Sequence, residues 1–170
     1  EFPASITKLM TVLLTLEKGS LTDSVTVSHE AVTNVEPGSA SVALQEGETL
    51  SLEQILQAIL LRSANEAANA AAEFTDGTLQ AFAAHMNSRA AELGCENTHF
   101  VNPSGLHDET HATTAYDMAL IARALLQNET FRSIMGSTYY EIPPTNKPPE
   151  PRYLHGQHHM LNRNSTYYYE

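Results

Sequence analysis

The sequence predicts an α+β protein that is mostly helical and has a few short strands. Three observations support this class. Apolar residues recur with helical spacing over much of the chain up to Met135, several of these stretches begin at a capping residue, and extended patterns are short or interrupted by proline. At 170 residues the chain is long enough for one domain with a real core, and two domains are not expected.

The first predicted element is a buried helix over residues 3–18. Pro3 suits the first turn of a helix, where its missing N–H is not needed, and Gly19 suits the position just past the end. Between Lys8 and Glu17 the side chains are mostly apolar, as expected for a core helix. Because a core helix rarely begins with a lysine, Lys8 is the first candidate functional residue.

Ser5 and Lys8 are three residues apart, which places both side chains on one face of a helix with Cβ atoms roughly 5–6 Å apart. A serine becomes a good nucleophile when a base accepts its proton, and a lysine can be that base if its pKa falls from about 10.4 to roughly 7–8. Apolar neighbours and the positive end of the helix dipole both lower it. A surface serine beside a solvated lysine is the alternative, and the spacing alone does not decide between them.

Short elements are predicted after this helix. Residues 24–27 alternate like a short strand, and residues 29–35 add a turn of helix. Residues 43–50 predict a tight hairpin with its turn at Glu46 and Gly47.

The clearest helix covers residues 51–62, where Ser51 and Gln54 form a capping box. Its apolar residues lie on one face, namely Leu52, Ile55, Leu56, Ile59 and Leu60. A second amphipathic helix is predicted over residues 78–93, and a third begins at Thr114.

Ser63, Asn65 and Glu66 are polar residues at the junction between the helix that ends near Arg62 and an alanine-rich helix. In the simplest interpretation, Ser63 or Asn65 only caps the second helix. Farther along the chain, a short helix around residues 130–135 precedes an extended edge strand, a proline-rich loop and a second extended segment, which do not form an independent domain.

Composition excludes several classes of partner. The chain has 9 Lys+Arg against 20 Asp+Glu, a net charge of −11, and no basic cluster, which argues against nucleic acid and against anionic membrane surfaces. The single cysteine, Cys95, excludes an internal disulfide and is interpreted as a small buried apolar residue. No signal peptide and no run of 18 apolar residues is present in the sequence.

His107 and His111 have the four-residue spacing that suits two metal ligands on one helical face, with Asp117 as a third. However, Gly105 and Leu106 predict a loop there, and the order of the acidic residues is not that of the zincin motif. A solvated loop is the favoured interpretation, and we expect neither a metal nor a cofactor.

Five motifs occur in order along the chain, each weak alone but specific as a set. They are Pro3-Ala-Ser5-Ile-Thr-Lys8-Leu-Met-Thr11, Ser63-Ala64-Asn65-Glu66-Ala67, Phe82-x-x-x-Met86-Asn87, Leu93-Gly94-Cys95-x-x-Thr98-x-Phe100-x-Asn102-Pro103-x-Gly105-Leu106, and Thr113-Thr114-Ala115-Tyr116-Asp117-Met118-Ala119. Together they resemble the serine-type D-Ala-D-Ala carboxypeptidases, the low-molecular-mass penicillin-binding proteins, over essentially the whole chain.

This resemblance implies a β-lactamase/transpeptidase-like fold, with residues 1–170 as a partial penicillin-binding catalytic domain truncated at both ends. Relatives have strands before the first motif and a Lys-Thr-Gly motif after the last, and the chain should be mostly the helical half of the fold. The resemblance also implies an extracytoplasmic enzyme, in the periplasm or on the outer face of the cytoplasmic membrane. The signal peptide and the C-terminal membrane anchor of such enzymes are absent from this chain.

Carried over to this chain, the resemblance makes Ser5 the nucleophile and Lys8 its base. Ser63 would relay a proton to the departing D-alanine, Asn65 would bind Lys8 and the substrate amide, and both would line the substrate-binding site. The implied substrates are peptidoglycan stem peptides ending in D-Ala-D-Ala, and β-lactams would be covalent inhibitors.

Two departures from the family pattern leave alternatives open. Ala64 replaces the usual glycine, and no Lys-Thr-Gly motif occurs, so we expect this chain to be weakly active or inactive. A non-catalytic relative or fragment that binds peptidoglycan or a partner is the alternative. A class A β-lactamase is less favoured, because the stretch at residues 99–105 does not match its Glu-x-x-Leu-Asn loop.

Overall fold

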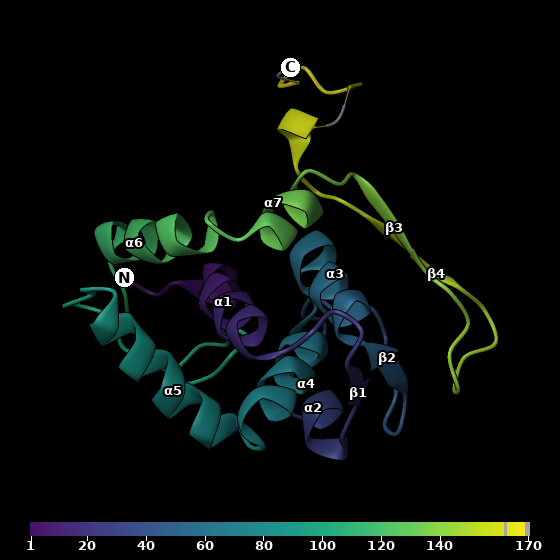
Figure 1. The fold of residues 1–170 in the computed structure, drawn as a ribbon, viewed down its shortest axis with the longest axis horizontal. Helices are drawn as coiled ribbons and strands as arrows, with labels where there is room; N and C mark the ends of the chain where they lie inside the picture. Colours follow the sequence, from purple (N-terminus) through teal and green to yellow (C-terminus); the bar gives the residue numbers. More distant parts are fainter. Residues whose placement is uncertain (162, 169–170) are drawn as a thin grey trace.

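The computed structural model describes residues 1–161 and 163–168 (Figure 1). The helices are η1 (Ala4–Thr7, a 3-10 turn), α1 (Lys8–Lys18), α2 (His29–Thr33), α3 (Leu52–Arg62), α4 (Asn65–Asp76), α5 (Leu79–Glu92), α6 (Ala115–Leu125), α7 (Glu129–Met135) and η2 (His159–Leu161, a 3-10 turn). The strands are β1 (Ser24–Thr26), β2 (Thr49–Ser51), β3 (Tyr139–Ile142) and β4 (Arg152–His155). The predicted α+β class, helix-rich with short strands, is confirmed.

Helix α1 lies at the centre of the helical body, in contact with α3, α4, α5 and α6 (Figure 1). Its side chains from Met10 to Thr15 are buried, as the apolar pattern predicted. The predicted single helix over residues 3–18 is wrong at its start, because the first turn is the separate 3-10 turn η1. Ala4 has φ +48°, a conformation in which an α-helix cannot continue, and this irregular turn carries Ser5.

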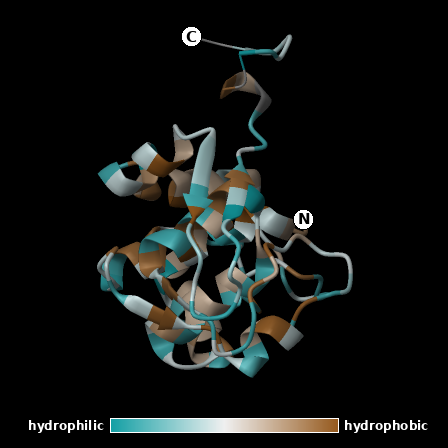
Figure 2. Cartoon of the chain, turned by 90° about the vertical axis from the view of Figure 1, so that its right-hand side faces the viewer, coloured by the Kyte–Doolittle hydropathy of each residue, from teal (hydrophilic) through white to brown (hydrophobic). Residues whose placement is uncertain are grey.

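Helices α3 and α4 pack against each other and against α1. The predicted capping box is present, because the Ser51 side chain accepts from the Gln54 N–H and the Gln54 side chain accepts from the Ser51 N–H. The alanines of α4 are buried, and their small side chains let the neighbouring helices approach closely. In Figure 2, hydrophobic segments lie within this helical body, and the chain after β4 extends away from it.

Strands β1 and β2 pair antiparallel, with Val25 opposite Leu50. The predicted hairpin over residues 43–50 is therefore wrong, although the turn at Glu46 and Gly47 is present. Segment 43–45 does not pair with β2, and the Gln45 N–H donates instead to the Glu48 side chain. The partner of β2 is instead β1, and local sequence pattern does not reveal this pairing.

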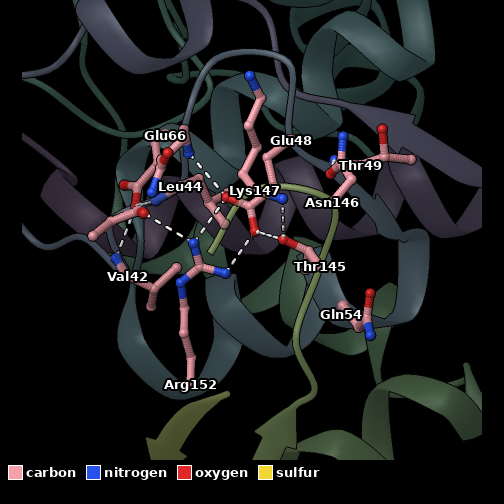
Figure 3. A network of polar contacts seen from close by, with 12 residues as sticks. Val42, Leu44, Glu48, Thr49, Gln54, Glu66, Thr145, Asn146, Lys147 and Arg152 are labelled. Carbon is pink, nitrogen blue, oxygen red and sulfur yellow. Dashed lines mark hydrogen bonds and ion pairs between the residues drawn. The ribbon is translucent and has the colours of Figure 1, made fainter. Parts of the chain in front are cut away.

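The two extended segments on either side of the proline-rich loop are present as predicted, and the structure pairs them antiparallel as β3 and β4. A buried ion pair connects β4 to the loop that precedes β2. Arg152 donates to both oxygens of the fully buried Glu48 carboxylate at 2.6 and 2.8 Å (Figure 3). Thr145 donates a further hydrogen bond to Glu48 at 2.7 Å. Burial alone would raise the pKa of Glu48, but these hydrogen bonds outweigh it and hold the pKa below its ordinary value.

We expect Arg152→Ala to lower the free energy of unfolding by about 3–5 kcal/mol at pH 7, because it leaves the Glu48 carboxylate buried without its cation. Since the ion pair requires an ionised Glu48, the difference from the wild type should shrink as the pH falls through the lowered pKa of Glu48. Urea unfolding at pH 7 and pH 4 measures both effects. Arg123→Ala, an exposed position on α6, is the control, and an equal loss in that variant would contradict the assignment.

No helix in the described part of the chain is long and apolar enough to cross a membrane. Cys95 is buried, as interpreted from the sequence, and its thiol donates to the Asp117 carbonyl at 3.5 Å. Burial raises the pKa of this thiol, which keeps it protonated and unreactive at neutral pH.

Candidate active site

Ser5 and Lys8 meet at the junction of η1 and α1. The Lys8 Nζ lies 3.2 Å from the Ser5 Oγ, within hydrogen-bonding distance, as the three-residue spacing predicted. Ser5 is exposed, whereas Lys8 is only 3% exposed. The hydroxyl is thus open to a ligand from solvent, while the amine that contacts it is shielded from water.

A tight loop at residues 102–106 fixes the Lys8 amine. The Lys8 Nζ donates to the Ser104 carbonyl at 2.6 Å, and on the same side of α1 the Thr11 hydroxyl donates to the Pro103 carbonyl at 2.7 Å. The loop is closed by Asn102, whose Oδ1 accepts from the Gly105 N–H at 2.7 Å. Because one N–H of Lys8 is directed at this carbonyl, the orientation of the amine is restricted. The Ser5 hydroxyl lies within its reach.

The 3-10 turn before α1 is held by this loop and by residues on either side of it. The His111 Nδ1 accepts from the Val101 N–H at 3.3 Å, so its Nε2 carries the hydrogen and donates to the Thr7 hydroxyl at 3.0 Å. Gly105 packs directly against the backbone of Ala4, the residue before Ser5. The position of the Ser5 hydroxyl therefore depends on a segment about a hundred residues away in the sequence.

Burial changes the acid–base behaviour of Lys8. It lowers the pKa of the ammonium from 10.5 to about 8, an effect that the negative charge of Glu66 partly opposes. A lysine with such a pKa is partly neutral near physiological pH, and only the neutral amine has a lone pair that can accept a proton from Ser5.

Ser63 and Asn65 lie at the junction of α3 and α4, as predicted. The interpretation that one of them merely caps α4 is wrong, because the N-cap is Ala64 and no side chain makes a capping hydrogen bond there. Ser63 ends α3 in the left-handed conformation with φ +58°, which is costly for a residue other than glycine and is common at functional sites.

The structure brings Ser5 and Lys8 together but does not join all four candidate residues by hydrogen bonds. Among the residues described, neither side chain of Ser63 and Asn65 bonds to Ser5 or Lys8. Asn65 is buried, and its N–H donates to the Ala40 carbonyl at 2.9 Å, whereas Ser63 lines a cavity of about 270 Å³ between α3, α7 and segment 156–158. Their catalytic roles stay predictions.

The two histidines considered as metal ligands have other contacts. Both ring nitrogens of His111 are engaged by Thr7 and Val101, and the His107 ring packs edge-on against Phe2 at 4.8 Å. Within residues 1–161 and 163–168, no three His, Cys, Asp or Glu side chains come together as a metal site.

Sequence reasoning missed the residues that position the lysine. The carbonyl of Ser104 carries no sequence signal of its own, although Asn102-Pro-Ser-Gly105 is typical of a tight turn stabilised by an asparagine side chain. Glu66 and His111 were noticed only as parts of other motifs. Their contacts join segments far apart in the chain, which no local pattern could indicate.

Comparison with known proteins identifies the family of this chain. The sequence profile of the peptidase S11 family, described as D-alanyl-D-alanine carboxypeptidase, matches residues 1–168. The chain is 39% identical over 140 residues to D-alanyl-D-alanine carboxypeptidase DacF of Bacillus subtilis, covering 79% of this chain and 35% of that protein. It is 37% identical over 134 residues to DacA of Escherichia coli K12, covering 74% of this chain and 33% of that protein.

Solved structures give the same result for the fold. The D-alanyl-D-alanine carboxypeptidase from Mycobacterium tuberculosis H37Rv superposes with a TM-score of 0.85 and 30% identity, covering 96% of this chain and 60% of that one. A mutant of the Streptomyces K15 DD-transpeptidase superposes with a TM-score of 0.86 and 25% identity, covering 95% and 67%. The predicted transpeptidase-like fold is confirmed, and the chain spans about a third of the length of the two curated relatives.

Proposed function

The chain belongs to the peptidase S11 family of D-alanyl-D-alanine carboxypeptidases, and from this we propose that it supplies the nucleophile and base of a serine-type carboxypeptidase. The substrates are peptidoglycan stem peptides ending in D-Ala-D-Ala, outside the cytoplasmic membrane. The observation that carries the proposal is the contact between the exposed Ser5 hydroxyl and the buried Lys8 amine. A surface serine beside a solvated lysine would not show this burial.

The reaction follows from the chemistry of this pair. The Ser5 Oγ attacks the carbonyl carbon between the two D-alanines, and the neutral Lys8 amine accepts the hydroxyl proton. The peptide C–N bond then breaks, and the departing amine takes a proton, relayed through Ser63, and leaves as D-alanine. Water hydrolyses the ester on Ser5, which returns the hydroxyl and releases a stem peptide one residue shorter. Asn65 orients the substrate amide in this scheme.

A β-lactam would enter the same reaction and stop at the ester. Its ring amide presents a carbonyl to the Ser5 Oγ as the dipeptide does, and the opened ring stays attached to the carbonyl carbon. The covalent adduct on Ser5 therefore reports the first half of the reaction.

The test is to incubate the protein with benzylpenicillin, digest it with trypsin and locate the adduct by mass spectrometry, together with an assay of D-alanine release from a peptide ending in D-Ala-D-Ala. We expect the mass increase of one opened penicillin on the peptide that contains Ser5. An adduct on another residue would refute the assignment of the nucleophile. Because the chain has no Lys-Thr-Gly motif, we expect D-alanine release to be weak or absent even when the adduct forms, whereas absence of the adduct as well would favour a non-catalytic role.

The rate of penicillin labelling should depend on the ionisation of Lys8. Because only the neutral amine accepts a proton and its pKa is about 8, the rate should rise roughly tenfold per pH unit between about pH 6 and pH 7.5 and level off above about pH 8.5. Single-turnover labelling with a fluorescent penicillin measures this profile. A rate that does not change across this range would show that Lys8 is not the base.

A further inference from the structure

Glu66 is a buried carboxylate beside the candidate site whose two oxygens have different surroundings. It is the second residue of α4 and is 3% exposed. Its Oε1 accepts from the Ser41 hydroxyl and the Val42 N–H, both at 2.7 Å, and from the Leu44 N–H at 3.4 Å (Figure 3). Its Oε2 is buried and has no hydrogen-bond partner among the described residues.

A buried charge without full compensation is costly, so the unpartnered oxygen needs an explanation. One oxygen with three donors would suffice to hold the 41–44 segment, and an amide side chain could supply it. A carboxylate in place of that amide adds a negative charge. Glu66 is the charged group with the largest effect on Lys8, and its charge favours the ammonium form that burial disfavours.

The 41–44 segment is itself held from several directions. Besides its bonds to Glu66, the Ala43 carbonyl accepts from Arg152 at 3.0 Å, and the neighbouring Ala40 carbonyl accepts from the Asn65 N–H at 2.9 Å. Ala43 has φ +57°, a conformation that needs such support. Glu66 thus joins this segment to the first turn of α4, which also carries Asn65. Figure 3 shows Glu66 beside Val42 and Leu44.

We propose that Glu66 is a positioning residue of the active site: its buried carboxylate holds the 41–44 segment against the turn that carries Asn65 and places a negative charge beside Lys8, on the helix that packs against α1. The assignment rests on the proposed function, because it matters for catalysis only if Lys8 is the base. Glu66 acts through these neighbours and contacts no reacting atom.

Other charged groups on the elements packed against α1 have contacts of their own. Arg89 of α5 forms ion pairs with Glu17 and Glu92. Asp117 of α6 accepts a hydrogen bond from Thr98. Asp76 of α4 contacts Lys18 and His85. Helix α3 contributes Glu53, next to Tyr140, and Arg62 at its C-terminal end. In the loop beside Ser104, burial lowers the pKa of His111, so this ring is neutral at neutral pH, and Asp108 bonds to Thr110.

The test is a direct titration of Lys8 by NMR, which the sequence makes simple because the chain has three lysines, Lys8, Lys18 and Lys147. With ¹³Cε-labelled lysine, Lys18→Arg and Lys147→Arg assign the signals. Glu66→Gln keeps an oxygen for the three donors and removes the charge. The midpoint of the Lys8 titration should fall by about 0.5 pH units or more, and the pH profile of penicillin labelling should move in the same direction.

Glu73→Gln is the matched control, because Glu73 lies seven residues further along α4, about 10 Å away along the helix axis, and accepts a hydrogen bond from Ser28. It should leave the Lys8 midpoint in place. A folded Glu66→Gln protein with an unchanged Lys8 midpoint would overturn the proposal, since a purely structural role would alter stability and leave the titration alone.

Glu66→Asp serves if Glu66→Gln does not fold, because it keeps the negative charge and only shortens the side chain. It should leave the Lys8 midpoint close to its wild-type value. A fall of about 0.5 pH units or more in this variant would overturn the proposal, since the shape of the side chain and not its charge would then control the titration of Lys8. The titration works without turnover, so a protein that binds no penicillin would refute the proposed function while the titration still decides the role of Glu66.

Discussion

Covalent labelling by a fluorescent penicillin should disappear completely in Ser5→Ala. The acyl-enzyme forms on one oxygen, and the Ser5 Oγ is the hydroxyl that lies 3.2 Å from the buried Lys8 amine. Without that oxygen no ester can form, whatever the rest of the site still binds. Lys8→Ala keeps the nucleophile but removes the base, and it should slow labelling by at least about 10²-fold, the low end of what a positioned base contributes.

Matched variants separate these effects from general damage. Ser20→Ala replaces an exposed serine in the turn after α1, and Lys18→Ala replaces a lysine at the C-terminal end of α1 whose side chain is 57% exposed. Both should label at the wild-type rate, as measured by gel fluorescence with all variants at equal folded concentration. Labelling that survives Ser5→Ala would place the nucleophile elsewhere in the chain.

The parts of the fold that could be predicted from the sequence depend on contacts between residues close together in the chain. The capping box at Ser51 and Gln54, and the capping bond from the Asp117 N–H to Thr114, involve residues three apart. Such contacts depend on local geometry alone, so both helix starts were found. The contact between Ser5 and Lys8 was predicted for the same reason, because the two residues are three apart.

The predictions that were wrong, or absent, depend on distant segments. Strand β2 pairs with β1 and does not form a hairpin with residues 43–45. The backbone N–H of Gln45 donates to the Glu48 side chain and not to β2. The anchor of Lys8 is the carbonyl of Ser104, 96 residues away, and every residue type carries a carbonyl. Sequence pattern could therefore indicate the contact between Ser5 and Lys8 but not the residues that hold the two side chains in place.

The second large effect of a substitution is expected at Gly105. Here the chain passes so close to η1, the turn that carries Ser5, that a side chain has no space. A Cβ at this position would lie 1.9 Å from the carbonyl oxygen of Ala4 and 2.5 Å from its carbonyl carbon. Because both atoms belong to the backbone, no side-chain rotation can relieve the overlap. Gly105→Ala must therefore displace either the loop that binds Lys8 or the turn that carries Ser5.

We expect Gly105→Ala to lower the free energy of unfolding by about 3 kcal/mol or more. Labelling of the fraction that remains folded should slow by about 10²-fold, which is the usual consequence of moving a reacting group by about 1 Å. Urea unfolding and single-turnover labelling measure the two losses separately. Labelling at the wild-type rate in a folded Gly105→Ala protein would show that this close contact does not position Ser5.

Gly77→Ala is the control that isolates the clash from backbone strain. Gly77 and Gly105 have nearly the same φ, +81° and +83°, so both substitutions force alanine into the left-handed conformation. A Cβ at Gly77, however, meets nothing within 4 Å. Gly77→Ala should therefore lower the free energy of unfolding only by the backbone strain, about 1 kcal/mol, and leave the labelling rate unchanged. The additional losses of stability and of labelling rate in Gly105→Ala then report the effect of the clash between the 102–106 loop and the turn that carries Ser5.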